Sequence, residues 1–383
     1  YGTFKTAPDA PVVAAEEAPG SRVVIIDAAS LWRCRFIKGT ELVRRQSGAL
    51  EHTIESPAWT WVKVKGKRSR TLRKAPKMRR RPPPPPDGWT DVGFDDSGWG
   101  LFRGPFSGSG AREHRATRLC PRTRLIFLRG GFRVTEPSKV GDLTLSLRFE
   151  GGAVAYLNGK EVARSFLPQG KIGPAVPARD YPLDAYVGPD GAVLSGRSSA
   201  RFPERFRKRI RAVSDVRVPA SLLRTGVNVL AVALHCAPGA EVMYVGKLGR
   251  GGYKGLLWPR VGLEELKLVA RPGAPVAPNT AGAARPASFR VWNHPVVRGF
   301  SVADYGDPLA PLRPVRIVGA RNGLFSGQVV ASCGRPIRAI RAEPSDLRAP
   351  GGATIPSSAV SIRYPLPDGS PRRRRGPATF DTL

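Results

Sequence analysis

The sequence predicts an all-β protein with two β-sandwich domains joined by linkers rich in proline and glycine. Its 383 residues include 43 glycines and 38 prolines, which separate short Val, Ile and Leu runs at a spacing typical of strands and tight turns. Leu143–Leu147 alternates strictly between apolar and polar residues, as a strand does when one face is buried and the other meets water. A chain of this length is large enough for two or three domains, each with its own core.

A predicted hairpin is the most informative feature. Ala153–Leu157 and Lys160–Ala163 lie on either side of Asn158 and Gly159. An Asn-Gly pair favours a type I′ turn, because both central residues of that turn have positive φ. We therefore expect the two segments to pair as neighbouring antiparallel strands.

Further strands are expected before and after this hairpin. They cover Val23–Ile26, Leu31–Ile37, Arg124–Leu128, Gly131–Val134, Leu143–Phe149, Asp215–Val218, Val227–His235 and Gly262–Val269. The stretch from Pro168 to Val213 is too long for an ordinary connection. We interpret it as a functional or decorating loop with a short helix around Glu204–Arg211.

These patterns divide the chain into six parts. Residues 1–22 are a loose lead-in, 23–61 hold strands that pack on the first sandwich, 62–87 form a basic and proline-rich linker, 88–270 form the first sandwich, 271–288 form a second linker, and 289–383 form the second sandwich. Pro82–Pro86 cannot lie in a sheet interior, because proline donates no ladder hydrogen bond. The first residue is Tyr and the chain ends without a stop signal, so we expect a fragment of a longer protein.

Three segments carry a resemblance to a known family. Trp89–Trp99, Gly151–Arg164 and Gly226–His235 have the order and spacing of the galactose-binding-like jelly roll, the sugar-binding domain beside the barrels of β-galactosidase-type glycoside hydrolases. The resemblance implies a domain that binds, shapes or covers carbohydrate and leaves catalysis to another segment. Such domains often have an acidic residue before the hairpin glycine, and we interpret Gly151 and Gly152 as a departure from that pattern.

A second resemblance covers residues 289–364. Ala320–Gly323, Gly327–Val330, Asp346–Leu347 and Val360–Tyr364 look like parts of the N-terminal β-sandwich of glycoside hydrolase family 123 and related planctomycete-type proteins. In that family a (β/α)₈ barrel with a catalytic Asp–Glu pair follows the sandwich. The resemblance therefore implies a catalytic barrel after Leu383 in the parent protein.

The chain is strongly basic, with a formal net charge of +32. Such an excess suggests a polyanionic partner, but most arginines stand singly in the expected strands, as solvent-facing strand residues do. We therefore expect no specific nucleic-acid role. One basic segment is dense enough to contact anionic polymers, and its candidate residues are Lys63, Lys65, Lys67, Arg68, Arg79, Arg80 and Arg81.

Location and cysteine chemistry follow from simpler observations. No apolar run approaches the ~18 residues of a membrane span, and the resemblance implies an extracellular or periplasmic protein. The four cysteines, Cys34, Cys120, Cys236 and Cys333, are too far apart for the paired spacings of zinc sites. Disulfide bonds between these cysteines remain possible in an exported protein. At this low density, however, we expect the cysteines to be small buried hydrophobic residues.

Asp95 and Asp96 form the adjacent carboxylate pair in the Phe94–Trp99 segment. Neighbouring side chains of an extended chain point to opposite faces, so the pair is badly placed to flank one sugar as a hydrolase requires. We expect a turn in which Asp96 and Ser97 bond backbone amides while Phe94 and Trp99 dock into the sandwich. The alternative is calcium ligation by Asp95 or Asp96; no other cofactor is expected.

Aromatic rings are the natural contacts for sugars, since the C–H face of a pyranose packs on an indole or phenol ring. Trp258, in the loop-like Gly255–Pro259, is the first candidate, followed by Tyr156 and Trp99. The list of candidates also includes Trp89 and Trp292. The alternative for each ring is a place in the core.

His235 ends an apolar strand beside Cys236. Their side chains point to opposite faces, so we expect a core histidine rather than a Cys–His nucleophile pair.

The sequence thus favours a non-catalytic, carbohydrate-binding or substrate-orienting portion of an exported glycoside-hydrolase-like protein, with a polysaccharide or glycan as its partner. The alternative is a structural or adhesive surface module that binds anionic polymers through its basic segment.

Overall fold

The structure is a computed structural model. It describes residues 22–53, 58–64, 67–73, 83–107, 117–119, 123–194, 200–245, 260–280, 289–294, 296, 300–301, 306–307, 309, 312, 314–315, 317–320, 322–333, 337, 339–364 and 379–380. Strands dominate, which confirms the predicted all-β class. The helices are single turns: α1 (Pro137–Val140), α2 (Pro203–Arg207), α3 (Val242–Val245), and the 3₁₀ turns η1 (Leu183–Ala185), η3 (Ala220–Leu222) and η4 (Ser357–Ala359). The chain divides into two compact units, unit 1 over residues 1–283 and unit 2 over residues 284–383.

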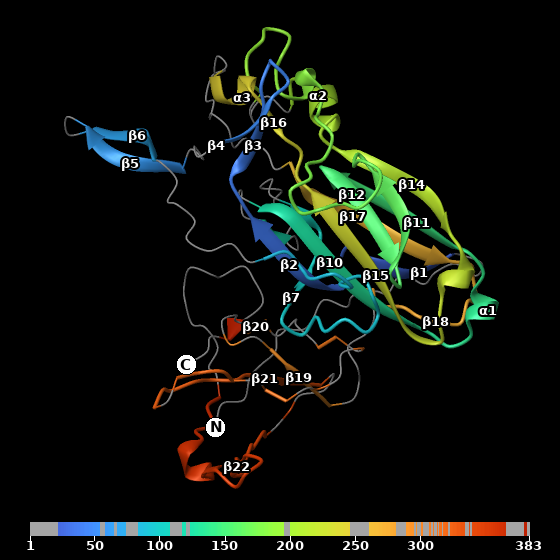
Figure 1. The fold of residues 1–383 in the computed structure, drawn as a ribbon, viewed down its shortest axis with the longest axis vertical. Helices are drawn as coiled ribbons and strands as arrows, with labels where there is room; N and C mark the ends of the chain where they lie inside the picture. The colour runs from blue at the N-terminus through green and yellow to red at the C-terminus, as the bar shows by residue number, and fades with distance from the viewer. Residues whose placement is uncertain are drawn as a thin grey trace. The chain divides into compact units, whose positions relative to one another are not determined.

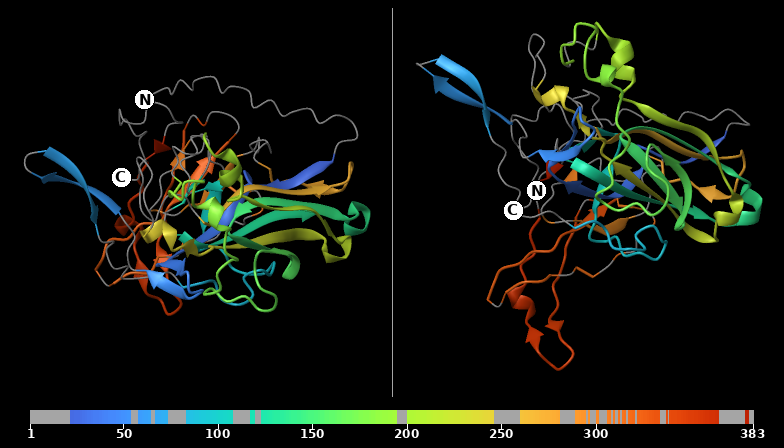
Figure 2. Two further views of the ribbon diagram at one scale, coloured as in Figure 1. Left: turned by 90° about the horizontal axis from the view of Figure 1, so that it is seen from above. Right: turned by 45° about the horizontal axis from the view of Figure 1, so that its top comes forward.

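Unit 1 contains a sandwich of two sheets, whose long strands form the body of the unit in Figures 1 and 2. The six-stranded sheet has the order β14 (Arg211–Val218), β11 (Leu143–Glu150), β17 (Gly262–Ala270), β8 (Phe106–Ser107) and β9 (Thr117–Arg118), with β1 (Val23–Asp27) beside β17. The seven-stranded sheet has the order β13 (Lys160–Ser165), β12 (Gly152–Leu157), β15 (Gly226–His235), β10 (Thr123–Val134), β2 (Leu31–Lys38) and β7 (Gly100–Arg103), with β18 (Val276–Ala277) beside β10.

The main core lies between these two sheets. In β11, Leu143, Leu145, Leu147 and Phe149 are buried there, while Thr144 and the other intervening residues face outward. Across from them, the 12-residue strand β10 contributes Ile126, Leu128 and Phe132 to the same core. Each fully buried side chain of this size stabilises the fold by about 2 kcal/mol.

Of the strands expected over residues 23–61, the first two belong to this sandwich. β1 pairs with β17, and β2 lies inside the seven-stranded sheet between β10 and β7. The predicted hairpin is also confirmed, since β12 and β13 pair across Asn158 and Gly159, which both have positive φ.

Two local expectations were wrong. Residues 124–128 and 131–134 belong to one continuous strand, β10, because Gly130 and Gly131 keep their pairing with β15. The short helix also ends earlier than expected, at Arg207, because Arg211 begins β14.

Residues 58–73 differ from the linker expected over 62–87. β5 (Ala58–Val64) and β6 (Lys67–Arg73) pair along their whole length as a two-stranded antiparallel ladder. The Trp, Thr and Val residues of β5 favour extended backbone, and this preference outweighs the high charge of the segment. A separate three-stranded sheet has β3 (Glu41–Arg44) in the middle, between β4 (Leu50–Thr53) and β16 (Gly239–Ala240).

Unit 1 extends into the residues that were predicted to form the second linker. β18 pairs with β10, and the backbone N–H of Asn279 donates to the carbonyl of Ile25 at 2.8 Å, so residues 271–280 complete unit 1. The described strands of unit 2 form three pairs: β19 (Arg290–Asn293) with β21 (Val329–Ser332), β20 (Phe300–Ser301) with β24 (Thr379–Phe380), and β22 (Leu347–Arg348) with β23 (Thr354–Ile355). Large apolar side chains of unit 2 remain exposed, with Val318 and Leu324 at 97% and 94%.

None of the helices in the described part of the chain is both long enough and apolar enough to span a membrane.

Candidate carbohydrate-contact site

An aromatic cluster covers the outer face of the seven-stranded sheet. Its five members are Trp89, Phe94, Trp99, Phe127 and Tyr156. Successive strand residues point to opposite faces. Since Ile126 and Leu128 lie in the main core, Phe127 faces outward, and Tyr156 does the same between the core residues Ala155 and Leu157. The segment 87–99 then lays its own aromatic side chains over these two.

Trp89 is the centre of the cluster. Its ring stacks on that of Trp99, with centroids 6.2 Å apart and an interplanar angle of 24°. The rings of Phe127 and Tyr156 meet it edge-on, at 5.1 Å and 6.0 Å. Trp89 and Tyr156 are half-buried residues, so both remain partly accessible while their rings contact other aromatic rings of the cluster.

Trp99 does not have the role that the sequence suggested. Its side chain is only 4% exposed and lies under Trp89 and against Phe94. A ring in that position cannot contact a sugar, because Trp89 and Phe94 cover it. Trp99 instead supports Trp89, and docks into the sandwich as the turn interpretation of this segment predicts.

Arg129 of β10 fixes the segment that carries Trp89. Its side chain is 3% exposed, and its guanidinium donates to the carbonyls of Trp89 and Asp91 and to the Asp96 carboxylate, the last at 2.8 Å. It also lies 5.2 Å from the centroid of the Phe94 ring. Hydrogen bonds to a buried charged group are among the stronger ones in proteins, so the loop and its indole are held in one position.

Asp95 and Asp96 have distinct structural roles. The Oδ1 atom of Asp95 accepts a hydrogen bond from the backbone N–H of Ser97 at 3.0 Å, so Asp95, rather than Asp96, bonds the turn amide. Asp96 forms ion pairs with Arg129 at 2.8 Å and Arg33 at 3.9 Å.

This arrangement is a poor fit to calcium. The ion takes six to eight oxygen ligands, whereas two guanidinium groups face the Asp96 carboxylate. Within the described residues, no three His, Cys, Asp or Glu side chains converge as a metal site requires.

Charged groups surround the exposed edge of Tyr156. Glu161 lies opposite Tyr156 across the β12–β13 ladder, and Arg164 of the same strand bonds both oxygens of Glu161. Burial raises the pKa of Tyr156, and the nearby charge of Glu161 raises it further. The phenol of Tyr156 is therefore neutral, which is the form that both stacks on a sugar and exchanges hydrogen bonds with hydroxyls.

The acid expected before the hairpin glycine is present, which corrects the supposed departure. Glu150 directly precedes Gly151 and is 5% exposed, and burial raises its pKa well above the ordinary value. Nearby, Arg211 donates to the carbonyls of Gly151, Arg179 and Asp180, and Tyr181 accepts the Gly151 N–H at 2.6 Å. These bonds tie the start of the β12–β13 hairpin to the connection between β13 and β14. We therefore interpret Glu150, Tyr181 and Arg211 as structural residues.

His235 is a core residue, as expected. It is buried, its Nδ1 lies 2.8 Å from the carbonyl oxygen of Val176, and burial lowers its pKa. The thiol of Cys236 donates to the carbonyl of Ala237 instead of facing His235. Cys34, another expected small hydrophobe, is buried as well. Trp292 is buried in β19, which leaves Trp89 and Tyr156 as the accessible rings among the described candidates.

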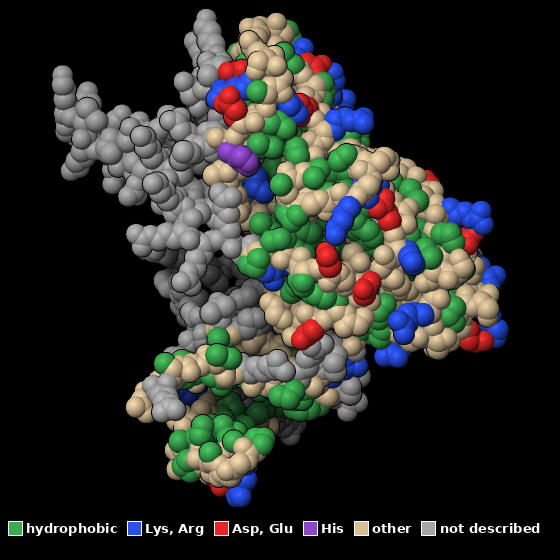
Figure 3. Space-filling view, in the orientation of Figure 1, with side chains coloured by type: hydrophobic (Ala, Val, Ile, Leu, Met, Phe, Trp, Pro, Cys, Tyr) green, Lys and Arg blue, Asp and Glu red, His purple; other side chains and the backbone are tan. Residues whose placement is uncertain are grey.

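Several predicted residues cannot be placed. Trp258, Cys120, Lys65, Arg79, Arg80 and Arg81 lie outside the described residues, as do the side chains of Lys63, Lys67 and Arg68. On the described surface that Figure 3 shows, acidic and basic side chains are interspersed over the sandwich. The roles of Arg129 and Glu150 could not be predicted from local sequence patterns, because both charged side chains are buried in the folded chain.

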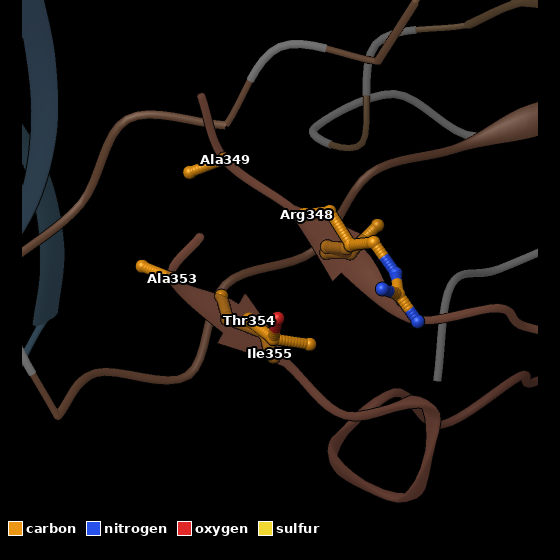
Figure 4. Close-up of a pocket in the computed structure, with 6 residues that line it drawn as sticks. Arg348, Ala349, Ala353, Thr354 and Ile355 are labelled. Carbon is orange, nitrogen blue, oxygen red and sulfur yellow. The ribbon is translucent and has the colours of Figure 1, made fainter. Parts of the chain in front are cut away.

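A shallow hollow of about 290 Å³ lies on unit 2. It is lined by Leu347, Arg348, Ala349, Ala353, Thr354 and Ile355. All six belong to the β22–β23 hairpin, and Figure 4 shows five of them, from Arg348 to Ile355. Leu347 and Ile355 are about half exposed. Ligand sites are normally enclosed and have convergent polar groups, so this hollow does not compete with the aromatic cluster.

Comparisons with known proteins find only weak structural matches. No family model matches the chain, and no curated protein matches it. Three similar solved structures are Bacteroides uniformis beta-glucuronidase 2 (12% identity, 68% of this chain and 20% of that one, TM-score 0.25), Bifidobacterium dentium beta-glucuronidase in complex with coumarin-3-O-glucuronide (13%, 72% and 33%, 0.28) and a glycosyl hydrolase family 2 member from Bacteroides cellulosilyticus (14%, 48% and 19%, 0.22).

The chain thus matches a third or less of the length of each of these proteins. They are glycoside hydrolases, whereas the resemblance to family 123 has no counterpart among them. At such low identities and TM-scores, the likeness assigns neither activity nor substrate to this chain.

Proposed function

We propose that unit 1 is a non-catalytic carbohydrate-binding sandwich whose contact surface is the pair of half-buried rings of Trp89 and Tyr156. The observation that carries the proposal is their geometry: the ring centroids are 6.0 Å apart and the planes meet at 80°. One ring can therefore stack on the C–H face of a pyranose while the other borders the edge of the same sugar.

Preorganisation supports this role. Trp89 is fixed from below by Trp99 and Phe127, and its backbone is fixed by Arg129. A ligand that docks on rigid rings loses less binding free energy to the ordering of side chains. A sugar site also requires a small number of polar groups that bond hydroxyls, and the Tyr156 hydroxyl and the exposed Asp91 carboxylate are the candidates.

The proposal assigns no hydrolysis to these residues. Glycoside hydrolysis requires two carboxyl groups about 5–10 Å apart on opposite sides of the sugar. The acids near the cluster, Asp96 and Glu161, form ion pairs with Arg129 and Arg164 and act as structural partners of these arginines. We infer that the sandwich binds or orients a polysaccharide for a catalytic barrel of a longer, exported glycoside-hydrolase-like protein.

Affinity electrophoresis in gels with neutral polysaccharides tests the proposal. Tyr156→Ala and Trp89→Ala should weaken retention about ten-fold, which corresponds to about 1.4 kcal/mol. Tyr156→Phe keeps the ring and should retain most of the affinity. Tyr364→Ala, which removes a half-exposed tyrosine of unit 2, is the matched control and should change nothing.

Thermal unfolding of each variant separates lost binding from lost folding. Folded Tyr156→Ala and Trp89→Ala proteins with unchanged retention on every polysaccharide that binds the wild type would overturn the proposal. Absence of retention for the wild type itself would do the same.

A further inference from the structure

The charges beside Trp89 and Tyr156 bear on which sugars the site accepts. Resting on the proposed function, we infer that the site selects uncharged sugars and discriminates against uronic acids, although the chain as a whole carries a charge of +32. Recognition of a sugar carboxylate depends on a guanidinium or ammonium group that is available to it. The arginines beside Trp89 and Tyr156 in the described part of the site already bind an acid or a carbonyl of the chain. Lys160 lies opposite the core-facing Leu157 in the β12–β13 ladder, and therefore on the other face from Tyr156.

Arg164 lies on β13, the strand paired with that of Tyr156, and bonds Glu161, the residue opposite Tyr156. Its Nε and Nη2 atoms donate to the two oxygens of Glu161, the first at 2.7 Å, and its Nη1 donates to the carbonyls of Pro168 and Gly170. Its side chain is only 10% exposed. Four of the five N–H groups of the Arg164 guanidinium thus already donate hydrogen bonds. No pair of N–H groups is left to bind both oxygens of a ligand carboxylate.

The cations under and beside Trp89 are engaged in the same way. Arg129 and Arg33 both pair with Asp96. Lys171 lies 3.7 Å from Asp87, two residues before Trp89. That pair is exposed and weak, but it offers a ligand no net positive charge.

Asp91 adds an acid to the same surface. Its carboxylate lies against the hairpin turn, where one oxygen is 2.4 Å from the position that a Cβ atom on Gly159 would occupy. Asp91 is exposed and forms no ion pair within the described residues. An ionised carboxylate accepts hydrogen bonds only, so Asp91 attracts sugar hydroxyls and repels a uronate.

The site and the overall charge therefore favour different ligands. The net charge raises weak, salt-dependent attraction to any polyanion. The aromatic site contributes the specific component, which depends on ring stacking and on hydroxyl groups. A uronate that reached the rings would lose the hydration of its carboxylate without gaining a cation partner.

Calorimetry with two matched oligosaccharides tests the inference. The probes are a β-linked glucose oligomer and the glucuronate oligomer of equal length, in 0.15 M salt, where long-range attraction is screened. Wild-type protein should bind the neutral oligomer at least about ten-fold more tightly. Tyr156→Ala should remove most of that affinity.

Glu161→Gln is the diagnostic variant, because it leaves Arg164 without its counter-charge. It should narrow the difference between the two oligomers about five-fold or more by improving glucuronate binding. Glu265→Gln is the matched control, since it makes the same charge change and removes one of the two carboxylates that pair with Arg148 on the other sheet. It should leave the difference unchanged.

The outcomes separate the two proposals. Equal or tighter glucuronate binding that disappears in Tyr156→Ala would overturn the selectivity and leave the proposed function intact. An unaltered ratio in a folded Glu161→Gln protein would also contradict the role given to Arg164. Affinity for both oligomers that is independent of Tyr156 would overturn the proposed function, and the selectivity with it.

Discussion

The Nδ2 atom of Asn158 donates a hydrogen bond to the Oδ1 atom of Asn228 at 2.7 Å. Asn158 also donates to the carbonyl of Leu222 and accepts from the backbone N–H of Val229 at 2.9 Å. Asn228 is fully buried and donates to the carbonyls of Arg224 and Gly226. The contact therefore joins the turn of the β12–β13 hairpin to the turn that begins β15.

Asn158→Asp should destabilise unit 1 by about 1–3 kcal/mol. The substitution removes both Nδ2 donations and places a carboxylate oxygen against two acceptors, the Oδ1 of Asn228 and the carbonyl of Leu222. A buried polar group that loses its partner costs this much. The urea midpoint of unfolding at pH 7 measures the effect.

The control for this change is Asn322→Asp. Asn322 also has positive φ but is exposed in unit 2, so its substitution should leave the unfolding of unit 1 unchanged. Equal losses for the two variants would show that turn conformation, rather than the Asn158–Asn228 contact, decides the stability.

The sequence was sufficient for features that depend on neighbouring residues. The Asn158–Gly159 turn and the alternating strand β11 follow from local preferences, and the structure confirms both. By contrast, the sequence does not distinguish Trp89 from Trp99 as the accessible ring. Arg129, which lies 30 or more residues away, fixes the loop and so decides that Trp99 is covered.

The other predictions that differ from the structure also have physical reasons. Glu150 ends a strand of alternating residues, where a solvent-facing charge is expected, but its side chain is buried in the folded chain. β5 and β6 form a hairpin because strand preference prevails over charge density there. In unit 2 the strand positions alone do not determine a stacked sandwich, because the described strands pair only two by two.

Glu150→Gln should stabilise the protein at neutral and alkaline pH and have little effect in acid. Burial raises the pKa of Glu150 above its ordinary 4.5, with the charge of Glu264 adding to the shift and that of Arg209 opposing it. A raised folded-state pKa gives a contribution that is complete below pH 4.5 and is lost as pH rises through the folded-state value. Glutamine keeps the shape and cannot ionise.

Urea unfolding from pH 4 to pH 9 measures this difference. The gain of Glu150→Gln over wild type should grow with pH, whereas Glu265→Gln, at an exposed position, should follow the wild-type curve. A constant offset between Glu150→Gln and wild type across this range would contradict the prediction.

Asp96→Asn should cost about 3 kcal/mol of stability, because it leaves the buried guanidinium of Arg129 without its counter-charge. It should also loosen the Trp89 loop and so weaken glycan retention. Asp95→Asn keeps an Oδ1 acceptor for the Ser97 N–H and should change stability by less than about 0.5 kcal/mol. Chemical unfolding of the two adjacent variants gives the comparison, and similar losses would refute the separate roles.

Gly130→Ala should destabilise unit 1 by about 1–3 kcal/mol through overpacking. A Cβ atom at Gly130 would lie 2.3 Å from the Cδ1 of Ile26 and 2.8 Å from the Trp32 ring. Both side chains are completely buried between the sheets, so neither can move aside without displacing a strand. Gly93→Ala is the control, since a Cβ there meets nothing within 4 Å. Thermal unfolding should therefore lower the midpoint for Gly130→Ala alone, and an equal midpoint for both variants would mean that the core is looser than these distances indicate.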